Sequence, residues 1–374
     1  MSKIGILTYH SAYNYGSALQ AFATQEAVGR FSEHPEIINY RMRSQKKIYT
    51  LYRTAFGPKD LVKDLLQLPI HQQRKQRAAR FESFCSTYLT LSEECETPDQ
   101  VYALWDRYDT IVSGSDQIWN KHSLELESCG WEYMYPYLLK DYPGRKVSYA
   151  SSISNMTDEE LQQIKGYVDR FDAVSVREIS STARMRALLD VPVVNVLDPT
   201  FLLTKDEWVE RLGLKTETDE HYILYYSLGG INYIKRDRPT LHALAEKYHC
   251  KVKVIMPFAN VQKDSVITPC PDYGPIEFLT AICNAELVVT DSFHGTILSV
   301  NFGKELYSLC KKGGSTFRKT DILGALGIGE RAVFDPEDLL GKQFSPIDYT
   351  AVADKLNAMR EDSLRYLKTA LTGE

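Results

Sequence analysis

One stretch of the chain, residues 286–303, has the pattern of a β-strand, a polar turn and a helix in direct succession. The apolar run 287–289 leads into the polar turn 291–296, and a second apolar stretch follows at 297–302. A short β-rich run, a turn with glycine and a helix-compatible continuation are typical of a strand–turn–helix unit. In an open α/β sheet, ligands bind beyond the carboxyl ends of the strands. The turn is therefore a candidate ligand-binding edge.

The same alternation of short apolar strands and helical stretches recurs along the chain. In the first half, helices such as 158–171 and 180–189 lie among strands that we predict at 4–8, 110–113, 147–150, 173–176 and 193–196. A second set of strands is predicted at 222–227, 252–256, 287–290 and 306–309. Strands that alternate with helices are typical of βαβ units, so we expect an α/β fold with largely parallel sheets.

The domain boundary is expected between the two sets of strands, near residues 198–218. We accordingly predict an amino-terminal domain over 1–205 and a carboxyl-terminal domain over 206–346. The end of the chain has the pattern of one long amphipathic helix. This segment, 347–374, is expected to pack back on the first domain.

Composition limits the classes of function. A chain of 374 residues with 44% apolar and 25% charged residues is typical of a soluble globular protein of two domains. Its net charge of −5 gives no indication of a nucleic-acid partner. No apolar run approaches the ~20 residues that span a bilayer. Seven scattered cysteines without a C-x-x-C pair favour a reducing cytoplasm and argue against disulfides or a zinc site. We expect a cytoplasmic protein that uses no metal or cofactor.

The segment 41–80 differs from the rest of the chain in charge. It contains eleven basic residues against two acidic ones, with aromatic and leucine residues between them. A basic amphipathic segment can bind an anionic membrane surface, which would place the protein peripherally at the inner face of the membrane. The alternative is a solvated helical excursion whose apolar face packs on its own domain.

Polar side chains cluster at five predicted strand ends or loops. Asn14, Tyr15 and Gly16 follow the first strand, Ser115, Asp116, Gln117 and Asn120 follow the second, Asp291, Ser292, His294, Gly295 and Thr296 follow the strand 287–290, and Arg177 and Arg318 lie in two further loops. Backbone N–H groups at a helix start can bind an anion, and an arginine fork binds a carboxylate or phosphate through two parallel bonds. A histidine in such a turn can titrate near neutrality, although a lone histidine more often caps the helix or bonds a carbonyl.

Several of these motifs, in this order, resemble the polysaccharide pyruvyl transferase family along nearly the whole chain. The resemblance rests on Ile4 to Thr8, Asn14-Tyr15-Gly16, Leu19-Gln20, the run GSDQIW at 114–119, Arg177-Glu178, Asp198-Pro199-Thr200, the run TDSFHGT at 290–296, and Arg318. Better-studied relatives have an arginine two residues before the histidine, where this chain has Ser292.

The resemblance implies two Rossmann-like domains that face a central cleft, as in the glycosyltransferase-B fold. It implies transfer of the pyruvyl unit of phosphoenolpyruvate, the donor substrate, onto a sugar as a ketal. The acceptor would be a saccharide of a surface polysaccharide or its lipid-linked precursor. His294 would bind the donor and act as acid and base, and Arg177 and Arg318 would be the anion clamps. Asp116, Gln117 and Asn120 would hold the sugar together with the loop around Asn14.

Two other classes of function remain open on the residues alone. A sugar-nucleotide-dependent glycosyltransferase would use the same architecture, and Lys311 and Lys312 before a glycine pair could bind its diphosphate. A non-catalytic sugar-binding relative would keep the fold without turnover. The simultaneous presence of His294, Arg177 and Arg318 argues against that second class.

Overall fold

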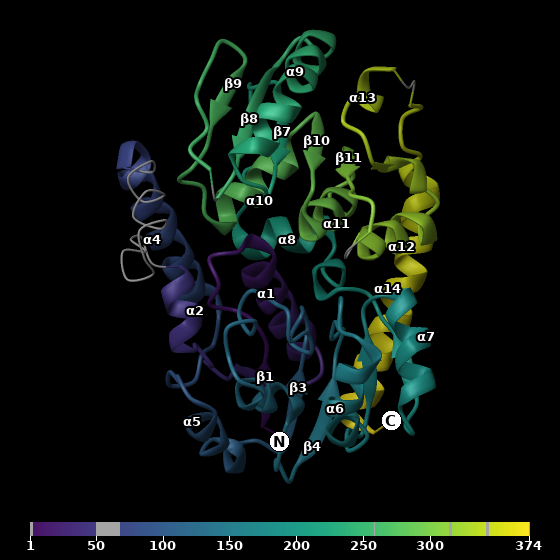
Figure 1. Cartoon of the computed structure of the whole chain (residues 1–374). Coiled ribbons are helices and arrows are strands. Elements are labelled where there is room, and N and C mark those ends of the chain that lie inside the picture. Colours follow the sequence, from purple (N-terminus) through teal and green to yellow (C-terminus); the bar gives the residue numbers. More distant parts are fainter. Residues whose placement is uncertain (1–2, 50–67, 258, 314–315, 342–343, 374) are drawn as a thin grey trace. The chain divides into compact units, whose positions relative to one another are not determined.

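We describe a computed structural model of the chain over residues 3–49, 68–257, 259–313, 316–341 and 344–373 (Figure 1). The chain forms two compact units. Unit 1 consists of Met1–Tyr49, Cys85–Leu203 and Asp354–Glu374, and unit 2 consists of Thr50–Phe84 and Thr204–Ala353. The main break, between Leu203 and Thr204, lies two residues before the expected boundary.

Unit 1 is built on a parallel sheet with the strand order β2-β1-β3-β4. Its strands are β1 (Ile4–Leu7), β2 (Glu36–Ile37), β3 (Thr110–Ser113) and β4 (Arg145–Ser148), and the parallel pair β5 (Val174–Val176) and β6 (Val193–Asn195) continues beyond β4 through single bridges. All four residues of β1 and of β3 are buried, because helices cover the sheet. The helices of this part include α1 (Tyr15–Gly29), α2 (Arg43–Ile48), α5 (Pro98–Tyr102), α6 (Asp158–Val168) and α7 (Ile179–Leu188).

Unit 2 contains a second parallel sheet, with the order β12-β11-β10-β7-β8-β9. Its strands are β7 (Tyr222–Tyr226), β8 (Lys251–Ile255), β9 (Ile267–Pro269), β10 (Leu287–Thr290), β11 (Glu305–Leu309) and β12 (Ala332–Val333). The helices are α8 (Lys205–Leu212), α9 (Ile231–Lys247), α10 (Pro275–Asn284), α11 (Phe293–Asn301), α12 (Phe317–Ala325) and α13 (Asp338–Gly341). The fully buried strands β7 and β10 lie side by side in the middle of the sheet, as expected for strands covered on both faces. The predicted α/β fold with largely parallel sheets is confirmed.

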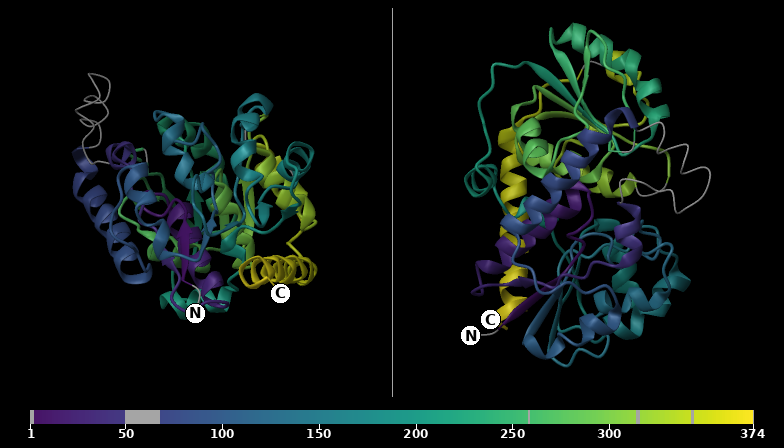
Figure 2. Two further views of the ribbon diagram at one scale, coloured as in Figure 1. Left: turned by 90° about the horizontal axis from the view of Figure 1, so that it is seen from below. Right: turned by 90° about the vertical axis from the view of Figure 1, so that its left-hand side faces the viewer.

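The carboxyl-terminal helix, α14 (Tyr349–Thr372), belongs to unit 1 from Asp354 onward. Tyr366 donates to the Ser148 carbonyl at the end of β4 at 2.8 Å, and Arg360 donates to the Phe201 carbonyl at 2.6 Å. Figure 2 shows this part of the helix in yellow beside unit 1. The predicted carboxyl-terminal helix is therefore present, and Arg360 and Tyr366 anchor it to backbone carbonyls of unit 1.

The basic segment 41–80 lies partly outside the described residues, which include α2 and the start of α4 (His71–Tyr88). Three of its described cations are paired with carboxylates of the protein. Arg43 and Lys46 both contact Glu96 at 2.6 Å, and Arg80 contacts Asp272 at 2.8 Å. Residues 71–84 fall in unit 2, whereas the sequence placed the whole segment in the first domain. No helix within the described ranges is long and apolar enough to cross a membrane.

Candidate functional site

The loop after β3 carries the predicted sugar-binding residues and begins with a backbone that requires glycine. Gly114 has a φ of 136°, and a Cβ there would lie 1.9 Å from the Tyr149 carbonyl oxygen. Ser115 next to it is fully buried and donates to the Ala150 carbonyl at 2.9 Å. The loops after β3 and β4 are therefore joined directly at the carboxyl edge of the sheet, which fixes the start of the site.

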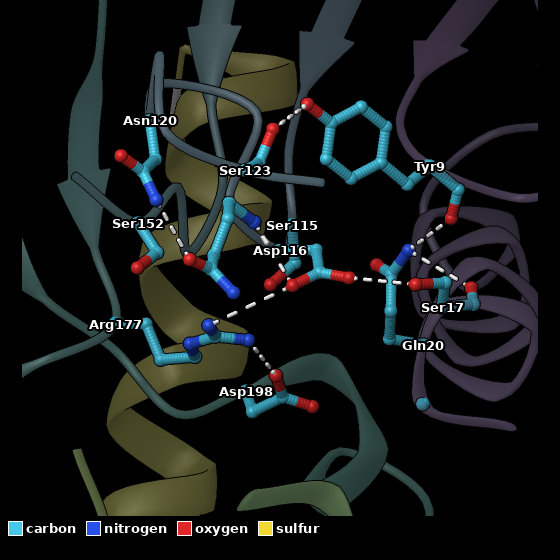
Figure 3. A network of polar contacts seen from close by, with 12 residues as sticks. Tyr9, Ser17, Gln20, Ser115, Asp116, Asn120, Ser123, Ser152, Arg177 and Asp198 are labelled. Atoms are coloured by element: carbon cyan, nitrogen blue, oxygen red, sulfur yellow. Dashed lines mark hydrogen bonds and ion pairs between the residues drawn. The ribbon is translucent and has the colours of Figure 1, made fainter. Parts of the chain in front are cut away.

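Asp116 lies at the centre of a polar network in unit 1 (Figure 3). Ser17 of α1 donates to one carboxylate oxygen at 2.9 Å, and the Gln117 backbone N–H donates to the other at 2.9 Å. The Arg177 guanidinium lies 3.9 Å from that second oxygen. Asp116 thus connects α1, the loop after β3 and the end of β5.

Arg177 is surrounded by acidic side chains. It contacts Asp198 at 2.8 Å and Glu178 at 3.1 Å, in addition to Asp116. Burial alone would lower the pKa of Arg177, but the carboxylates of Glu178, Asp198 and Asp116 together raise it above its usual value. Its side chain is 2% exposed. In this structure the guanidinium contacts protein carboxylates, so the expected contact with a donor anion stays a prediction.

The other polar residues of unit 1 order the loops around Asp116. Asn120 donates to the Gln117 side chain at 2.8 Å, and its own oxygen accepts from the His122 N–H at 3.1 Å. Asn14 is the N-cap of α1 and accepts from the Gly16 N–H at 3.0 Å. Gln117 and Asn14 remain half-buried, whereas Tyr15, Gly16 and Asn120 are buried. Asn14 and Gln117 are the predicted residues of this unit with the most side chain open to a ligand.

Gln20, which belongs to the family-like run Leu19-Gln20, has a structural role. It lies one turn into α1 and is fully buried. Its amide donates to the Thr8 hydroxyl at 2.8 Å. It also donates to the Tyr9 carbonyl at 2.7 Å (Figure 3). A buried amide with several bonds fixes the path of the chain between β1 and α1. A single sequence gives no signal for such a role.

In unit 2, the turn between β10 and α11 follows the predicted strand–turn–helix pattern. Ser292 is the N-cap of α11 and accepts from the Gly295 N–H at 3.2 Å. A Cβ at Gly295 would lie 2.6 Å from the Thr290 hydroxyl and 2.9 Å from the Tyr226 ring, so only glycine fits. Thr296 is fully buried and shares a hydrogen bond of 2.8 Å with Ser308 of β11. Ser292, Gly295 and Thr296 therefore set the position of α11 on the sheet.

Asp291 is held by the loop after β7. Its carboxylate accepts from the Ser227 hydroxyl at 2.7 Å and from the Leu228 N–H at 2.8 Å. Lys319 of α12 donates to the Asp291 carbonyl at 2.9 Å and also to the Leu309 carbonyl. Burial lowers the pKa of Lys319, an effect that Cys310 and Asp291 oppose. Lys319 is a buried cation at this edge that the sequence reasoning did not single out.

His294 and Arg318 both pack against Phe293. The His294 ring lies edge-on to the Phe293 ring with 5.2 Å between centroids, and the Arg318 guanidinium lies 5.6 Å from the Phe293 centroid. A guanidinium at this distance from an aromatic ring is held by a cation–π interaction. Two residues 24 positions apart in sequence are thus brought to one side chain at the start of α11. The structure therefore places the predicted histidine and arginine in one neighbourhood.

The candidate site residues form two groups, one in each unit. Unit 1 groups Asp116, Gln117, Asn120 and Arg177 with Asn14, and unit 2 groups Asp291, Ser292 and His294 with Arg318. Within the described parts of the chain, no cluster of three or more His, Cys, Asp or Glu side chains has an arrangement that could bind a metal ion.

Two parallel sheets with polar residues at their carboxyl edges define an α/β protein of the glycosyltransferase-B fold class. Arabidopsis thaliana UGT89C1 complexed with UDP-L-rhamnose shares this fold at 10% identity, with a TM-score of 0.54 over 100% of this chain and 98% of that one. UDP-GlcNAc 2-epimerase from Neisseria meningitidis, bound to UDP-GlcNAc, matches at 9% identity, with a TM-score of 0.52 over 99% and 94%. At such identities the likeness shows the fold alone.

The family is shown by sequence. A model of the polysaccharide pyruvyl transferase family matches residues 14–309, which include both groups of site residues except Arg318. The chain belongs to this family of transferases. No curated protein matches it significantly.

Proposed function

We propose that the protein transfers the pyruvyl unit of phosphoenolpyruvate onto a sugar of a surface polysaccharide or its precursor, as a ketal. One observation carries the proposal within the family. His294 and Arg318 both pack on Phe293 at the start of α11, so a proton-transferring group and a fixed cation lie together. The donor is an anion that requires both during the reaction.

The reaction has a definite balance of bonds and protons. Two sugar hydroxyls form two C–O bonds to the carbon that bears the phosphate, and the bond from that carbon to the phosphate oxygen breaks. The two hydroxyl protons are released; one ends on the methylene carbon, which becomes a methyl group, and the other leaves with the phosphate. A histidine that accepts a proton from a hydroxyl and donates it to the methylene carbon meets this requirement. We assign that transfer to His294.

The donor's negative charges require cations in fixed positions. Arg318 carries a planar fork that suits a carboxylate or a phosphate and stacks on aromatic faces. Ser292 stands where better-studied relatives have an arginine, and its hydroxyl caps α11. The proposal therefore gives the donor contact to Arg318 and to the first N–H groups of α11. Asp291 is oriented by Ser227 and Leu228, which holds its carboxylate in place.

The acceptor is assigned to unit 1. Asn14 and Gln117 are half-buried beside the Asp116 network, and amide and carboxylate groups form the directional hydrogen bonds that select among sugar hydroxyls. Because Asp116 is fixed by Ser17 and Gln117, its carboxylate is preorganised at this edge. A saccharide acceptor, either soluble or lipid-linked, is the class of substrate that fits.

A sugar-nucleotide-dependent glycosyltransferase remains the second candidate. The two solved structures of similar fold hold UDP-sugars, and Lys311 and Lys312 were the residues expected to bind a diphosphate. Lys311 instead lies over the Tyr233 ring, 4.7 Å from its centroid. Because Lys311 contacts this ring, it does not support the diphosphate site that was expected there. Pyruvyl transfer is therefore the better supported of the two functions.

A melting screen separates the two candidates. The protein would be heated with phosphoenolpyruvate, with UDP-sugars and with GDP-sugars, each at saturating concentration. A ligand that binds only the folded protein raises Tm, by an amount that follows from its concentration relative to Kd. We expect a shift with phosphoenolpyruvate that is reduced in Arg318→Lys. A shift with a UDP-sugar or GDP-sugar alone would favour the glycosyltransferase.

A further inference from the structure

A buried carboxyl group of unit 1, that of Glu125, has no role in the reaction described above. Glu125 lies in the long connection between β3 and β4 and is 6% exposed. Tyr49 is the residue directly after α2. Its hydroxyl group donates a hydrogen bond to Oε1 of Glu125 at 3.1 Å. A buried carboxyl bonded to a half-buried tyrosine connects the interior of unit 1 to its surface.

Tyr49 forms an aromatic pair with Tyr13. Their ring centroids lie 5.7 Å apart with planes at 48°, and both side chains are half-buried. Tyr13 directly precedes Asn14, the N-cap of α1. A second bond joins the same two segments, because the Ser11 hydroxyl donates to the Gln45 side chain at 3.1 Å. The pair is therefore positioned by the loop after β1 on one side and by α2 on the other.

The surroundings of Glu125 contain acidic and phenolic groups from several elements. Burial raises the pKa of Glu125 to about 7, with a further rise from the Asp116 carboxylate, while the bond from Tyr49 opposes the shift. Tyr9 and Tyr137 also face it, and the Cys129 thiol donates to its backbone carbonyl at 3.6 Å. The Lys121 ammonium group is directed to the carbonyls of Leu126 and Cys129.

We propose that Tyr13 and Tyr49 form the platform on which the acceptor sugar ring stacks, and that Glu125 is the residue that positions the platform. The inference deepens the proposed function and rests on it for the sugar's role as acceptor. The faces of aromatic rings pack against the apolar face of a pyranose, while polar groups at the rim bond its hydroxyls. Asn14, adjacent to Tyr13, and the Asp116 loop supply such groups.

Glu125 makes the platform dependent on pH. A carboxylate accepts a stronger hydrogen bond than a carboxylic acid, so deprotonation fixes the Tyr49 hydroxyl more firmly. Sugar affinity should then increase as pH rises through about 7, where Glu125 loses its proton. The donor-side residues in unit 2 take no part in this effect, so donor binding should not share the profile.

The test measures sugar binding in the absence of any donor. Methyl β-D-galactopyranoside, methyl β-D-glucopyranoside and methyl α-D-mannopyranoside would be titrated into the full-length protein by NMR at pH 6 and pH 8. The variants are Tyr13→Ala, Tyr49→Phe and Glu125→Gln. The matched control is Tyr167→Phe, from a second aromatic pair of unit 1 whose centroids lie 5.2 Å apart.

We expect at least one glycoside to bind the wild-type protein, more tightly at pH 8. Tyr13→Ala should weaken binding about tenfold, the effect of roughly 1.4 kcal/mol of lost contact. Tyr49→Phe and Glu125→Gln should remove most of the pH dependence, and Tyr167→Phe should behave as wild type. The inference is overturned if no glycoside binds, or if all four variants bind alike. Binding as expected without phosphate release from phosphoenolpyruvate would refute the proposed reaction and leave the platform standing.

Discussion

The Arg177 guanidinium donates to the Asp198 carboxylate at 2.8 Å, and both side chains are almost completely buried. Asp198 also accepts from the Thr200 hydroxyl at 2.7 Å, so the pair joins the end of β5 to the segment that leads out of unit 1. Because Glu178 and Asp116 also face Arg177, one cation compensates three acidic groups. The network is therefore sensitive to the loss of that cation.

Replacement of Arg177 by methionine should destabilise the protein strongly. Removal of one partner leaves buried carboxylates without compensation, which costs about 3–5 kcal/mol of unfolding free energy. Urea denaturation measures the change. The control is Arg365→Ala, which removes an ion pair with Asp362 that is 72% exposed and should cost less than about 1 kcal/mol. Equal losses in the two variants would show that the buried network contributes nothing beyond a surface pair.

His294→Ala should lower pyruvyl transfer by roughly two to four orders of magnitude, the range for loss of a general acid or base. His294 is buried beside Phe293, so Tm must be measured in parallel. The matched control is His122→Ala, which removes an exposed histidine paired with Glu160 at 2.8 Å and should leave turnover intact. A loss of activity that only follows a loss of Tm would indicate a structural histidine.

Arg318→Lys should raise the KM for the donor much more than the KM for the acceptor, because lysine keeps the charge and loses the planar fork. Phe293→Leu should have a similar but smaller effect, since it removes the ring over which the guanidinium lies. Steady-state kinetics with each substrate varied in turn provide the comparison. Unchanged donor KM in both variants would remove Arg318 from the donor site.

Glu125 should make the stability of the protein depend on pH. Its pKa in the folded protein is about 7, above the ordinary value of 4.5, so the folded state binds the proton more tightly than the unfolded chain. Unfolding free energy should therefore fall as pH rises from about 4.5 to 7, by roughly 3 kcal/mol in total. Glu125→Gln should lack this contribution. If unfolding free energy depended on pH in the same way in the wild-type protein and in Glu125→Gln between those two pH values, the raised pKa of Glu125 would be contradicted.

Peripheral membrane contact through residues 41–80 is also testable. Arg43, Lys46 and Arg80 are paired with carboxylates, which leaves less of the segment's charge for a membrane. Each basic residue near an anionic leaflet contributes about 1 kcal/mol, so a few of the remaining ones suffice for reversible binding. We expect sedimentation with anionic liposomes that is weakened by salt and absent with zwitterionic liposomes. Equal recovery in the supernatant with both liposome types at low salt would rule out this contact.

The inner strands of both sheets, such as β1, β3, β7 and β10, were predictable because each is a short run of mostly apolar residues that is buried along its length. The short edge strands β2, β9 and β12 were not predicted. β10 and α11 illustrate this, since the run 287–289 and the turn with Gly295 already indicated a strand, a turn and a helix. The parallel arrangement followed from the helices between the strands. These signals come from residues that are close together in the sequence, and such local patterns can be recognised in a single sequence.

The contacts that define the site depend on chain segments far apart in sequence, and these were not predictable. Arg177 and Asp116 are 61 positions apart, and nothing local showed that the arginine faces three carboxylates. Glu125 lies in a connection without helical or strand periodicity, so no sequence pattern indicated that this side chain is buried. Arg318 was expected in a loop, whereas it lies in the first turn of α12. The same helix places Lys319, which the sequence did not single out, against the ends of β10 and β11. Such roles emerge only from tertiary packing.

In the proposed reaction, the protein moves a pyruvyl unit from phosphoenolpyruvate to a sugar. The most direct measurement is phosphorus and proton NMR of the purified protein with phosphoenolpyruvate and the methyl hexopyranosides, with UDP-sugars in a parallel sample. We expect phosphate release that requires a glycoside, the appearance of a new methyl singlet of the ketal, and loss of both signals in His294→Ala. Consumption of a UDP-sugar without any glycoside-dependent phosphate release from phosphoenolpyruvate would contradict it.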